Sequence, residues 1–581
     1  MITLRHMLLR CLTASGIVLG ACSSDTTEPS PPPVPTGLAA NQLSLTSAHV
    51  SWSAVTGAAS YKLERGTAGT FTQVGAAIVG TSYDDTGLTA GVAYSYRVAA
   101  VSAGGTSAFS TAVDITTGLK TKLIDANITA SRTLFADTVY TLKGYIKVQN
   151  GAVLTIQAGA KIVGDAATVG SSLWILRGAR IEAVGTEAAP IVFTSAKAAG
   201  QRKPGDWGGI IIVGNGIINR TEATILTEGG AAGVAENYAG GNNNADNSGT
   251  LKYVRIEFAG YDISNGAGQE LNSLSMYAVG SGTRIEYVQT VAGLDDSFEW
   301  WGGAVDARYL VSYEAGDDHF DWTEGFAGRV QFMIGLQSTK LDPAAGSGLF
   351  STDPRGFEGD GCDPGVVGTT CTVVAGPAGA GTSTPYSRPV FANFTFVGPG
   401  QGVAGFPADG NGMVLRRGTA GTLFNGIVAR TRGTAIQMRD AFTDSLRLRD
   451  SLNFTNIILA ENGPAATPTN YDADGLDTTP PTESARRYAQ AAKFATQNHR
   501  IGTDAASLFL SLTPATLDWT PKVTAGQPDP TTGGSQVLPP KLAARVAGYP
   551  YSGGWVNTTY VGAAAPAGPK WWQNWTVHIT N

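Results

Sequence analysis

The sequence predicts an all-β protein whose main body is a solenoid of stacked β-coils. Glycine accounts for 75 of the 581 residues, roughly twice its usual share, and charged residues make up only 15% of the chain. Short apolar runs separated by glycine-rich turns continue from residue 119 to the C-terminus, and one motif recurs with a period near 22 residues. A repeat of this length built from short strands is typical of a β-solenoid.

The chain begins with a targeting segment. Arg5 and Arg10 precede an apolar run over residues 12–19, which is too short to span a bilayer. The sequence LGAC that ends at Cys22 resembles a bacterial lipobox, and this resemblance implies cleavage before Cys22 and attachment of lipid to that cysteine. We therefore expect residues 1–21 to be a lipoprotein signal peptide. An ordinary secretory signal is the alternative.

The segment after the cysteine indicates where the protein is held. Serines at positions 23 and 24, in place of an aspartate, favour export to the outer membrane and the cell surface, with the lipid on Cys22 as the only membrane anchor. Residues 22–35 are rich in Ser, Thr and Pro and end in PSPPPVP. They predict an extended tether.

Residues 36–118 predict one compact β-unit. Apolar and polar residues alternate over 43–52, 61–65 and 94–101, as expected for half-buried strands. The unit resembles a fibronectin type III domain, and the resemblance rests on Trp52, Tyr61, Leu88 and Tyr94. It implies a seven-stranded sandwich with Tyr94 at a tyrosine corner and no chemistry of its own.

Residues 119–581 resemble right-handed parallel β-helix proteins. More narrowly, they are similar to a group of bacterial surface lipoproteins that share the segments PGDWGG, DDSFEWWGG and DDHFDWTEGF and a closing YVGA with two tryptophans; here these are residues 204–209, 295–303, 317–326 and 560–563, with Trp572 and Trp575. No activity is established for that group. The resemblance therefore implies an architecture and leaves the function open.

Two long insertions interrupt the coils. One spans residues 220–248, is rich in Gly and Asn, and is a candidate binding loop. The other spans 341–388 and is rich in Gly and Pro. Cys362 and Cys371 lie in the second insertion of an exported chain, which favours a disulfide. Residues 482–496 follow a proline and carry apolar side chains at helical spacing, so they predict the one short helix of this part.

The repeated motif places acidic residues in register. Tyr253, Tyr287 and Tyr309 are each followed nine positions later by an aspartate, and these are Asp262, Asp296 and Asp318. Stacked coils lie about 4.8 Å apart, so the three carboxylates should form a ladder. Such a ladder costs free energy unless a cation, backbone N–H groups, a basic neighbour or protonation offsets the repulsion.

One interpretation of the ladder is catalytic, because it resembles the sites of polysaccharide-active β-helices. Asp295, Asp296, Asp317 and Asp318 would be the acid and base groups, since coil spacing brackets the carboxylate separations that glycosidases use. Three neighbouring tryptophans would stack on sugar rings and a histidine would serve as a base; these are Trp300, Trp301, Trp322 and His319. The GHG and RIK segments of pectin hydrolases are absent.

A second interpretation is a calcium site, because carboxylates on adjacent coils supply the oxygens that Ca²⁺ prefers. The ligands would be Asp262, Asp296 and Asp318. The segment DADGLD offers another weak calcium site with Asp472, Asp474 and Asp477. In a third interpretation the aspartates only cap coil turns through hydrogen bonds to the backbone.

Composition excludes several function classes. A net charge of −6 without a basic run gives no reason to expect nucleic-acid binding. We found no dinucleotide or phosphate-binding glycine motif, so no organic cofactor is expected, and the five scattered histidines disfavour zinc. We predict a lipid-anchored surface protein that binds an extracellular polysaccharide or another surface. The alternatives are a glycoside hydrolase or lyase that uses the paired aspartates, and a structural surface-layer component.

Overall fold

The computed structural model describes residues 30–578 except 68, 90, 223, 231–233, 235–236, 265, 267–268, 363–370, 372–384, 408–409, 465–469 and 473–496. It separates into two compact units that meet between Leu119 and Lys120. The predicted helix at 482–496, the aspartates Asp474 and Asp477, and Cys22 lie outside the described residues. Among the described residues, no helix has the length and hydropathy needed to cross a membrane.

The first unit is a sandwich of two antiparallel sheets. One sheet contains β1 (Ala39–Ser44), β2 (Ser47–Ser51) and β5 (Ser82–Thr86), and the other contains β3 (Ser60–Thr67), β4 (Thr70–Ile78), β6 (Ala93–Ser102), β7 (Gly105–Thr106) and β8 (Val113–Thr116). Trp52 packs on Tyr61 in the core at a ring-centroid distance of 5.3 Å. The Tyr94 hydroxyl accepts a hydrogen bond from the Thr89 N–H at 3.0 Å. This confirms the fibronectin type III sandwich.

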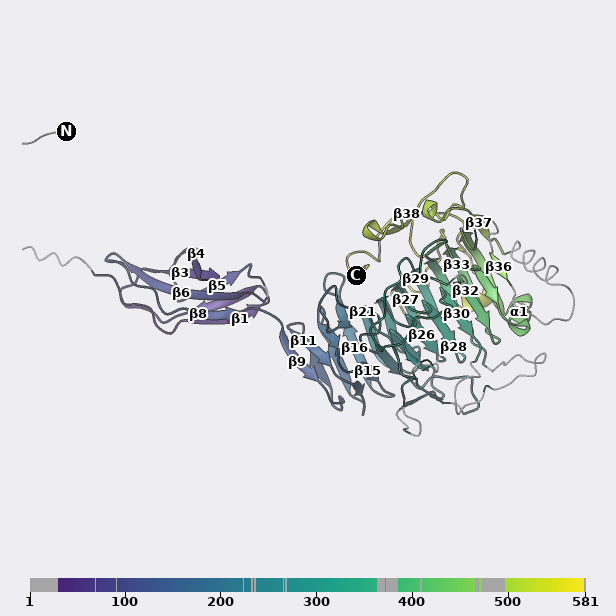
Figure 1. Cartoon of the computed structure of the whole chain (residues 1–581), viewed down its shortest axis with the longest axis horizontal. Helices are drawn as coiled ribbons and strands as arrows, with labels where there is room; N and C mark the ends of the chain where they lie inside the picture. Colours follow the sequence, from purple (N-terminus) through teal and green to yellow (C-terminus); the bar gives the residue numbers. More distant parts are fainter. Residues whose placement is uncertain are drawn as a thin grey trace, which may run out of the picture. The chain divides into compact units, whose positions relative to one another are not determined.

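The second unit is a parallel β-helix, as the sequence predicts (Figure 1). Each coil contributes one short strand to a ten-stranded parallel sheet. In spatial order these strands are β12 (Tyr145–Val148), β15 (Ser172–Ile175), β18 (Ile210–Val213), β24 (Leu274–Tyr277), β26 (Phe298–Trp301), β28 (Phe320–Thr323), β30 (Phe357–Asp360), β32 (Met413–Arg416), β34 (Ile436–Met438) and β36 (Tyr471–Asp472).

The remaining strands of the coils form a fifteen-stranded sheet. Its early coils contribute pairs of short strands: β9 (Lys120–Ile124), β10 (Arg132–Leu134), β11 (Thr138–Leu142), β13 (Val153–Ile156), β14 (Lys161–Gly164), β16 (Arg180–Val184) and β17 (Ile191–Ser195). Later coils contribute one longer strand each: β21 (Gly249–Glu257), β25 (Arg284–Val291), β27 (Asp306–Tyr313), β29 (Arg329–Leu336), β31 (Val390–Val397), β33 (Gly421–Ala429) and β35 (Leu452–Ala460), with β37 (Arg500–Gly502) last. Because β21 pairs with both β16 and β17, each long strand turns a corner within its length.

The corner of each long strand is a residue in the left-handed region. Tyr253, Tyr287 and Tyr309 occupy it with φ of 49°, 54° and 61°, and their rings stack at 4.4 and 4.5 Å. The next coil holds Phe332 at this corner, and the coils after it hold asparagines, which adopt this conformation more readily than other side chains do. The in-register tyrosines that the repeat predicts are therefore present.

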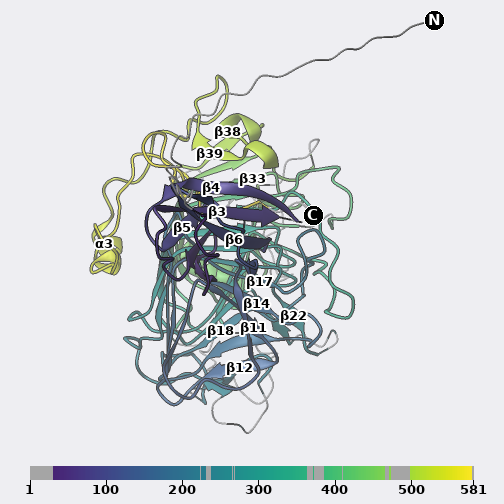
Figure 2. The same ribbon diagram turned by 90° about the vertical axis from the view of Figure 1, so that its left-hand side faces the viewer.

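The C-terminal segment runs back along these corners. It contains β38 (Phe509–Ser511), β39 (Asp518–Pro521) and α3 (Pro540–Val546), and Figure 2 shows α3 at one side of the stacked coils. Trp575 lies edge-on to Tyr253 at 5.7 Å, and the Tyr551 hydroxyl donates to the Ile285 carbonyl at 2.8 Å. The closing tryptophan motif thus covers the tyrosine stack.

Small elements outside the coils complete the unit. The first predicted insertion contains the hairpin β19 (Ile225–Leu226) and β20 (Tyr238–Ala239), and a second hairpin comprises β22 (Tyr261–Asp262) and β23 (Glu270–Leu271). A helix that the sequence did not predict, α1 (Ala441–Leu448), follows β34 and begins where the Asp440 carboxylate accepts the Thr443 N–H.

Candidate functional site

The ten-stranded sheet carries a row of acidic side chains on its outer face. Register pairs Glu299 of β26 with Asp321 of β28, and Asp321 with Glu358 of β30. Successive strand residues point to opposite faces, so Phe298 and Phe320, which precede two of these acids, lie inside and stack at 5.6 Å. The same alternation that fills the core therefore aligns the carboxylates outside.

A second acidic row lies in the turn that precedes each strand. The Asp318 N–H donates to Asp296 Oδ1 at 2.8 Å, and the Arg355 N–H donates to Asp318 Oδ1 at 2.6 Å. Asn272 Oδ1 accepts the Asp296 N–H at 3.0 Å in the same way. One oxygen of each of these side chains thus caps the next coil, as in the turn-capping interpretation, and the second carboxylate oxygen of Asp296 and Asp318 remains for further contacts.

The two rows surround an open cavity of about 180 Å³. Its acidic lining residues are Glu228, Glu270, Asp295, Asp296, Glu299, Asp317, Asp318, Asp321, Glu358 and Asp360. We call this cavity the acidic cleft. The basic side chains that line it are Arg416 and Arg417.

Arginines neutralise only one end of the acidic cleft. Arg416 pairs with Asp360 at 2.8 Å and with Glu358 at 2.7 Å, and Arg355 pairs with Glu358 at 2.7 Å and with Asp318 at 3.2 Å. No basic side chain of the described chain forms an ion pair with the carboxylates at the other end, which are Asp295, Asp296, Glu299 and Asp321. That end therefore gathers carboxyl groups that have no basic partner among the described residues.

Burial of these groups changes their proton affinity. Desolvation first, and repulsion between neighbouring carboxylates second, raise the pKa values of Asp295, Asp296, Glu299 and Asp321 well above the ordinary range. Desolvation raises the pKa of Asp317 to about 7, although the charge of Arg355 opposes the shift. A bound cation would remove both causes, because it solvates the carboxylates and cancels their repulsion.

The oxygen positions fit a divalent cation. Asp295, Asp296 and Asp317 can each place one carboxylate oxygen within 4.8 Å of the others, and Asp296, Glu299 and Asp321 can do the same. Calcium–oxygen distances are about 2.3–2.6 Å, so two ligands of one Ca²⁺ lie no more than about 5 Å apart. In addition, Oδ1 of Asp317 and Oδ1 of Asp321 are buried and accept no hydrogen bond from the described residues.

The structure corrects the predicted place of Asp262. That carboxylate belongs to the β22–β23 hairpin, where it accepts the Ser264 N–H at 2.9 Å and the Gly266 N–H at 2.6 Å. Asn272 occupies the ladder position instead. The cause is that the hairpin is inserted into this coil between the corner tyrosine and the strand, which displaces the ladder position along the sequence.

The predicted aromatic ligands separate into two groups. Trp300 and Trp322 are fully buried in the β-helix core, so they offer no face to a ligand; the sequence could not decide between the two orientations. Trp301 lies on the outer face of the sheet, where it is 6% exposed within an apolar cluster, stacks on Tyr277 at 5.2 Å and lines the acidic cleft. Of the three predicted tryptophans, only Trp301 remains a candidate for sugar stacking.

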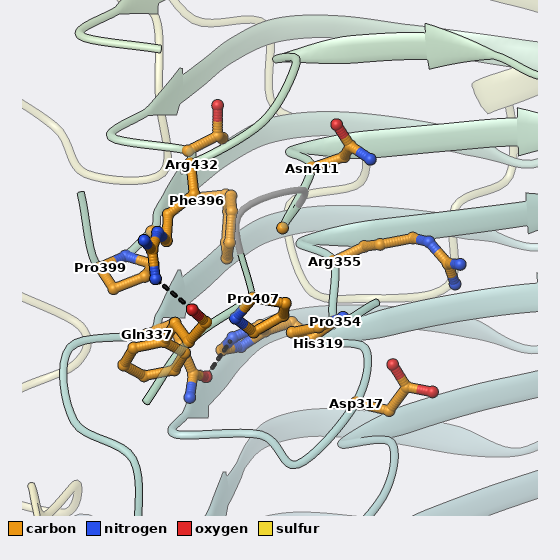
Figure 3. A pocket seen from close by; sticks show the side chains of 14 residues that line it. Asp317, His319, Gln337, Pro354, Arg355, Phe396, Pro399, Pro407, Asn411 and Arg432 are labelled. Atoms are coloured by element: carbon orange, nitrogen blue, oxygen red, sulfur yellow. Dashed lines mark hydrogen bonds between the residues drawn. The ribbon is translucent and has the colours of Figure 1, made fainter. Parts of the chain in front are cut away.

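His319 lies behind the acidic cleft in a separate cavity of about 20 Å³. Its ring hydrogen-bonds Ser312 Oγ through Nδ1 at 2.6 Å and Gln337 Oε1 through Nε2 at 3.0 Å. Figure 3 shows His319 beside Gln337 and Pro407, whereas the polar ends of Asp317 and Arg355 lie to the other side. Burial lowers the pKa of His319 to about 4. His319 is therefore a neutral buried group without access to a substrate in the cleft.

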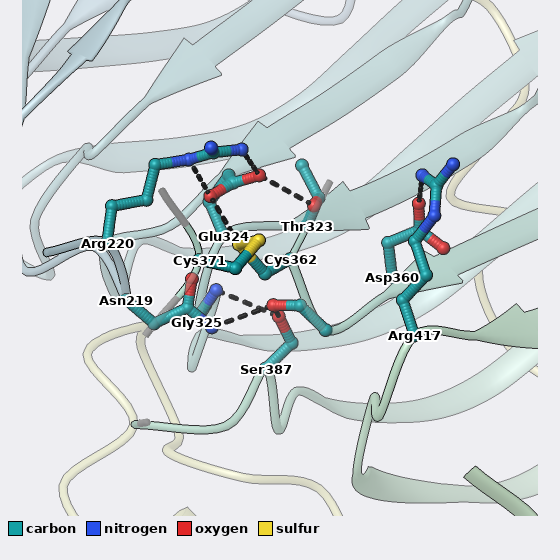
Figure 4. Close-up of a disulfide and its surroundings, with 11 residues drawn as sticks. Asn219, Arg220, Thr323, Glu324, Gly325, Asp360, Cys362, Cys371, Ser387 and Arg417 are labelled. Atoms are coloured by element: carbon teal, nitrogen blue, oxygen red, sulfur yellow. Dashed lines mark hydrogen bonds and ion pairs between the residues drawn. A yellow bond between two sulfur atoms is a disulfide. The ribbon is translucent and has the colours of Figure 1, made fainter. Parts of the chain in front are cut away.

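The remaining predictions concern the second insertion and the last coils. Cys362 and Cys371 form the predicted disulfide just beyond β30, beside the buried ion pair between Arg220 and Glu324 (Figure 4). The Asp472 backbone continues the outer row, but Val414 and Gln437 separate it from Glu358.

The sequence interpretation missed several acids of the cleft, including Glu358 and Asp360. They lie in β30, inside the segment 341–388 that was expected to be an insertion. A signal was present, because FEGD at 357–360 repeats the Phe-acidic pattern of FEWW and FDWT. This copy begins 37 residues after the previous one, at Phe320, instead of 22, so the period of the repeat did not reveal it.

Comparisons with known proteins agree with this architecture. Residues 126–507 match the family model described as pectate-lyase like beta helix domain, and residues 33–116 match the fibronectin type III domain. The chain is 44% identical over 102 residues to exoglucanase B of Cellulomonas fimi, a match that covers 17% of this chain and 9% of that protein. The chain thus corresponds to a small part of exoglucanase B.

Two solved structures resemble a short part of the chain. An Fn3-like protein from Clostridium thermocellum is 38% identical, with 15% of this chain and 92% of that chain covered and a TM-score of 0.14. The FN5 domain of Drosophila Lar is 26% identical, with 15% and 97% covered and a TM-score of 0.14.

The raised pKa values predict how stability depends on pH. Asp317 and Glu358 have folded-state pKa values of about 7 and about 8, above their reference values of 3.8 and 4.5. The folded protein therefore retains protons that the unfolded chain releases. In metal-free protein, we expect the free energy of unfolding to fall between about pH 4 and about pH 8, because unfolding becomes easier as these protons are lost.

Urea unfolding followed by tryptophan fluorescence measures this effect, since all tryptophans except Trp52 lie beyond residue 119. Asp317→Asn should reduce the slope. Asp125→Asn, at an exposed position of the same unit, should not change it. A flat or rising profile in metal-free wild type would contradict the assigned electrostatics.

Proposed function

The chain belongs to the pectate-lyase-like β-helix family, and from this premise we propose that its acidic cleft binds divalent cations and, through them, an acidic extracellular polysaccharide. The supporting observation is the pair of oxygen triads, Asp295–Asp296–Asp317 and Asp296–Glu299–Asp321, whose carboxylates form no ion pair with basic side chains of the described chain. Ca²⁺ is the cation that suits an all-oxygen ligand set in an exported protein.

The sign of the charge argues for an acidic ligand that is bridged by cations. Without cations, the cleft does not attract a polyanion, because its carboxyl groups outnumber the arginines at its rim. A Ca²⁺ ion with six to eight ligand positions keeps some of them open when three carboxylates bind it, and uronate carboxylates of a glycan can fill these positions. Trp301 also lines the cleft, and because it is only 6% exposed it offers a sugar ring a small apolar contact at most.

The role proposed for the site is binding without cleavage. Arg416 and Arg417 at the rim are both ion-paired with Asp360, so neither is free to act as a base. His319, which the sequence analysis offered as a base, is buried away from the cleft.

Cleavage of the same polysaccharide is the second candidate. One observation favours it: a pKa of about 7 would allow Asp317 to act as a general acid near neutral pH.

Retention of polygalacturonate tests the proposed binding. We expect the full chain to be retarded in an affinity gel that contains polygalacturonate and calcium, and to migrate freely when calcium is absent or when neutral dextran replaces the polymer. Asp296→Asn combined with Asp321→Asn should weaken retention at least tenfold, because it removes a ligand from each triad. Asp125→Asn is the matched control, since Asp125 is exposed and distant in sequence from the cleft residues.

Two outcomes would contradict the binding proposal. Equal retention with and without calcium would show that no cation bridges the polymer. Appearance of unsaturated uronate or of new reducing ends during incubation would favour cleavage over binding alone.

Display of this site on the cell surface is part of the proposal, and it rests on the lipobox-like sequence that ends at Cys22. A lipid on Cys22 would place the fibronectin type III unit and the β-helix outside the membrane, where an extracellular glycan is accessible. In the native host, Cys22→Ser should release the protein from the membrane fraction. Continued sedimentation of this variant with membranes would contradict a lipid anchor.

A further inference from the structure

A second cavity, of about 500 Å³, lies at the other end of the short strands. The acidic cleft contains the turn aspartates that precede β26 and β28, whereas this cavity contains Ala304 and Ala327, which follow those strands. Its charged lining residues are Asp306, Arg329, Arg388 and Arg545. We call it the arginine pocket.

The arginine pocket carries uncompensated positive charge. Arg329 is neutralised by Asp306, with Nε to Oδ1 at 2.8 Å and Nη2 to Oδ2 at 2.5 Å. Neither Arg388 nor Arg545 forms an ion pair with a described residue. Two guanidinium charges therefore face the cavity without a counterion.

Backbone carbonyls hold the guanidinium groups of Arg329 and Arg545 in place. Arg329 Nη1 donates to the carbonyls of Arg545 and Ala547 at 3.2 and 2.8 Å, which fixes the end of α3 against β29. Arg545 in turn donates through Nη2 to the Arg388 carbonyl. Since each guanidinium has five N–H donors, unused donors remain on Arg388 and Arg545.

Proximity of these like charges is unfavourable. Burial, followed by repulsion from Arg388 and Arg329, lowers the pKa of Arg545 to about 10, so the group is still charged at neutral pH. A bound anion would relieve this repulsion. Asn244, which also lines the pocket, offers a further donor. Its Oδ1 accepts the Ile217 N–H, and its Nδ2 has no partner in the described part of the chain.

We infer that the arginine pocket binds the oxyanion of an acidic sugar, a carboxylate or a sulfate, without a metal ion. Guanidinium groups match the planar fork of a carboxylate and the oxygens of a sulfate. The cavity volume lies within the range of small-ligand sites, and the alanines of its wall leave room for a sugar ring. This site goes beyond the calcium-dependent function, because its charge is of the opposite sign and it needs no cation.

Titration calorimetry on the full chain at low ionic strength tests this inference. Divalent cations are removed on a chelating resin, because soluble chelators are polyanions that would compete for the pocket. This condition also separates the arginine pocket from the acidic cleft, which should be inactive without cations. The probes are D-glucuronate, D-glucose and inorganic sulfate.

We expect D-glucuronate to bind and D-glucose to give no heat. Arg388→Gln combined with Arg545→Gln should weaken glucuronate binding at least tenfold. Arg388→Gln alone should weaken it less and should leave folding intact, because its exposed guanidinium makes no hydrogen bond within the described chain. Arg180→Gln, an equal charge change at an exposed position of β16, should have no effect.

Three results would overturn the inference: absence of glucuronate binding, equal loss of affinity in Arg180→Gln, or wild-type affinity in the double variant. Inorganic sulfate binding as tightly as glucuronate would overturn the assignment to a sugar and indicate a site for free anions.

Discussion

Parallel stacking in register is the constraint on which the rest of the β-helix depends. Every residue lies about 4.8 Å from its equivalent in the next coil, so each feature of one coil is repeated beside itself. For apolar residues this repetition is favourable, as the stack of Phe298, Phe320 and Phe357 shows. For acidic residues it is costly, and the outer row through Glu299, Asp321 and Glu358 carries that cost.

The molecule offsets this cost by different means along the row. Backbone N–H groups donate to Asp296 and Asp318, and arginines pair with the acids at the β30 end. Neither means reaches the far ends of Asp295, Glu299 and Asp321. A bound cation would offset the repulsion at these carboxyl groups. The proposed function therefore follows from the geometry of the coils. In the arginine pocket the repulsion is between positive charges, since Arg388 and Arg545 form no ion pair with a described residue. A bound anion would offset it.

The features that could be predicted from the sequence are those that depend on local residue patterns. These are the two β-units, the tyrosine stack, the alignment of Asp296 with Asp318, and the disulfide. The predicted place of Asp262 was wrong because an inserted hairpin shifts the coil register by an amount that sequence spacing does not reveal. Strict alternation places Trp300 on the same face as Phe298, but the sequence alone does not show that this face is the inner one. The arginine pocket was beyond sequence reasoning, because a hydrogen bond joins Arg329 to Arg545 across 216 residues when the C-terminal segment folds back.

A crystal structure with a lanthanide in place of calcium would test the central claim most directly. The account predicts anomalous scattering peaks within the two triads, with carboxylate oxygens of Asp295, Asp296 and Asp317, and of Asp296, Glu299 and Asp321, at coordination distance. Calcium added in excess should displace these peaks. A structure without any peak in the acidic cleft, with the carboxylates joined in short proton-sharing pairs, would contradict it and show that protonation alone balances the stacked charges.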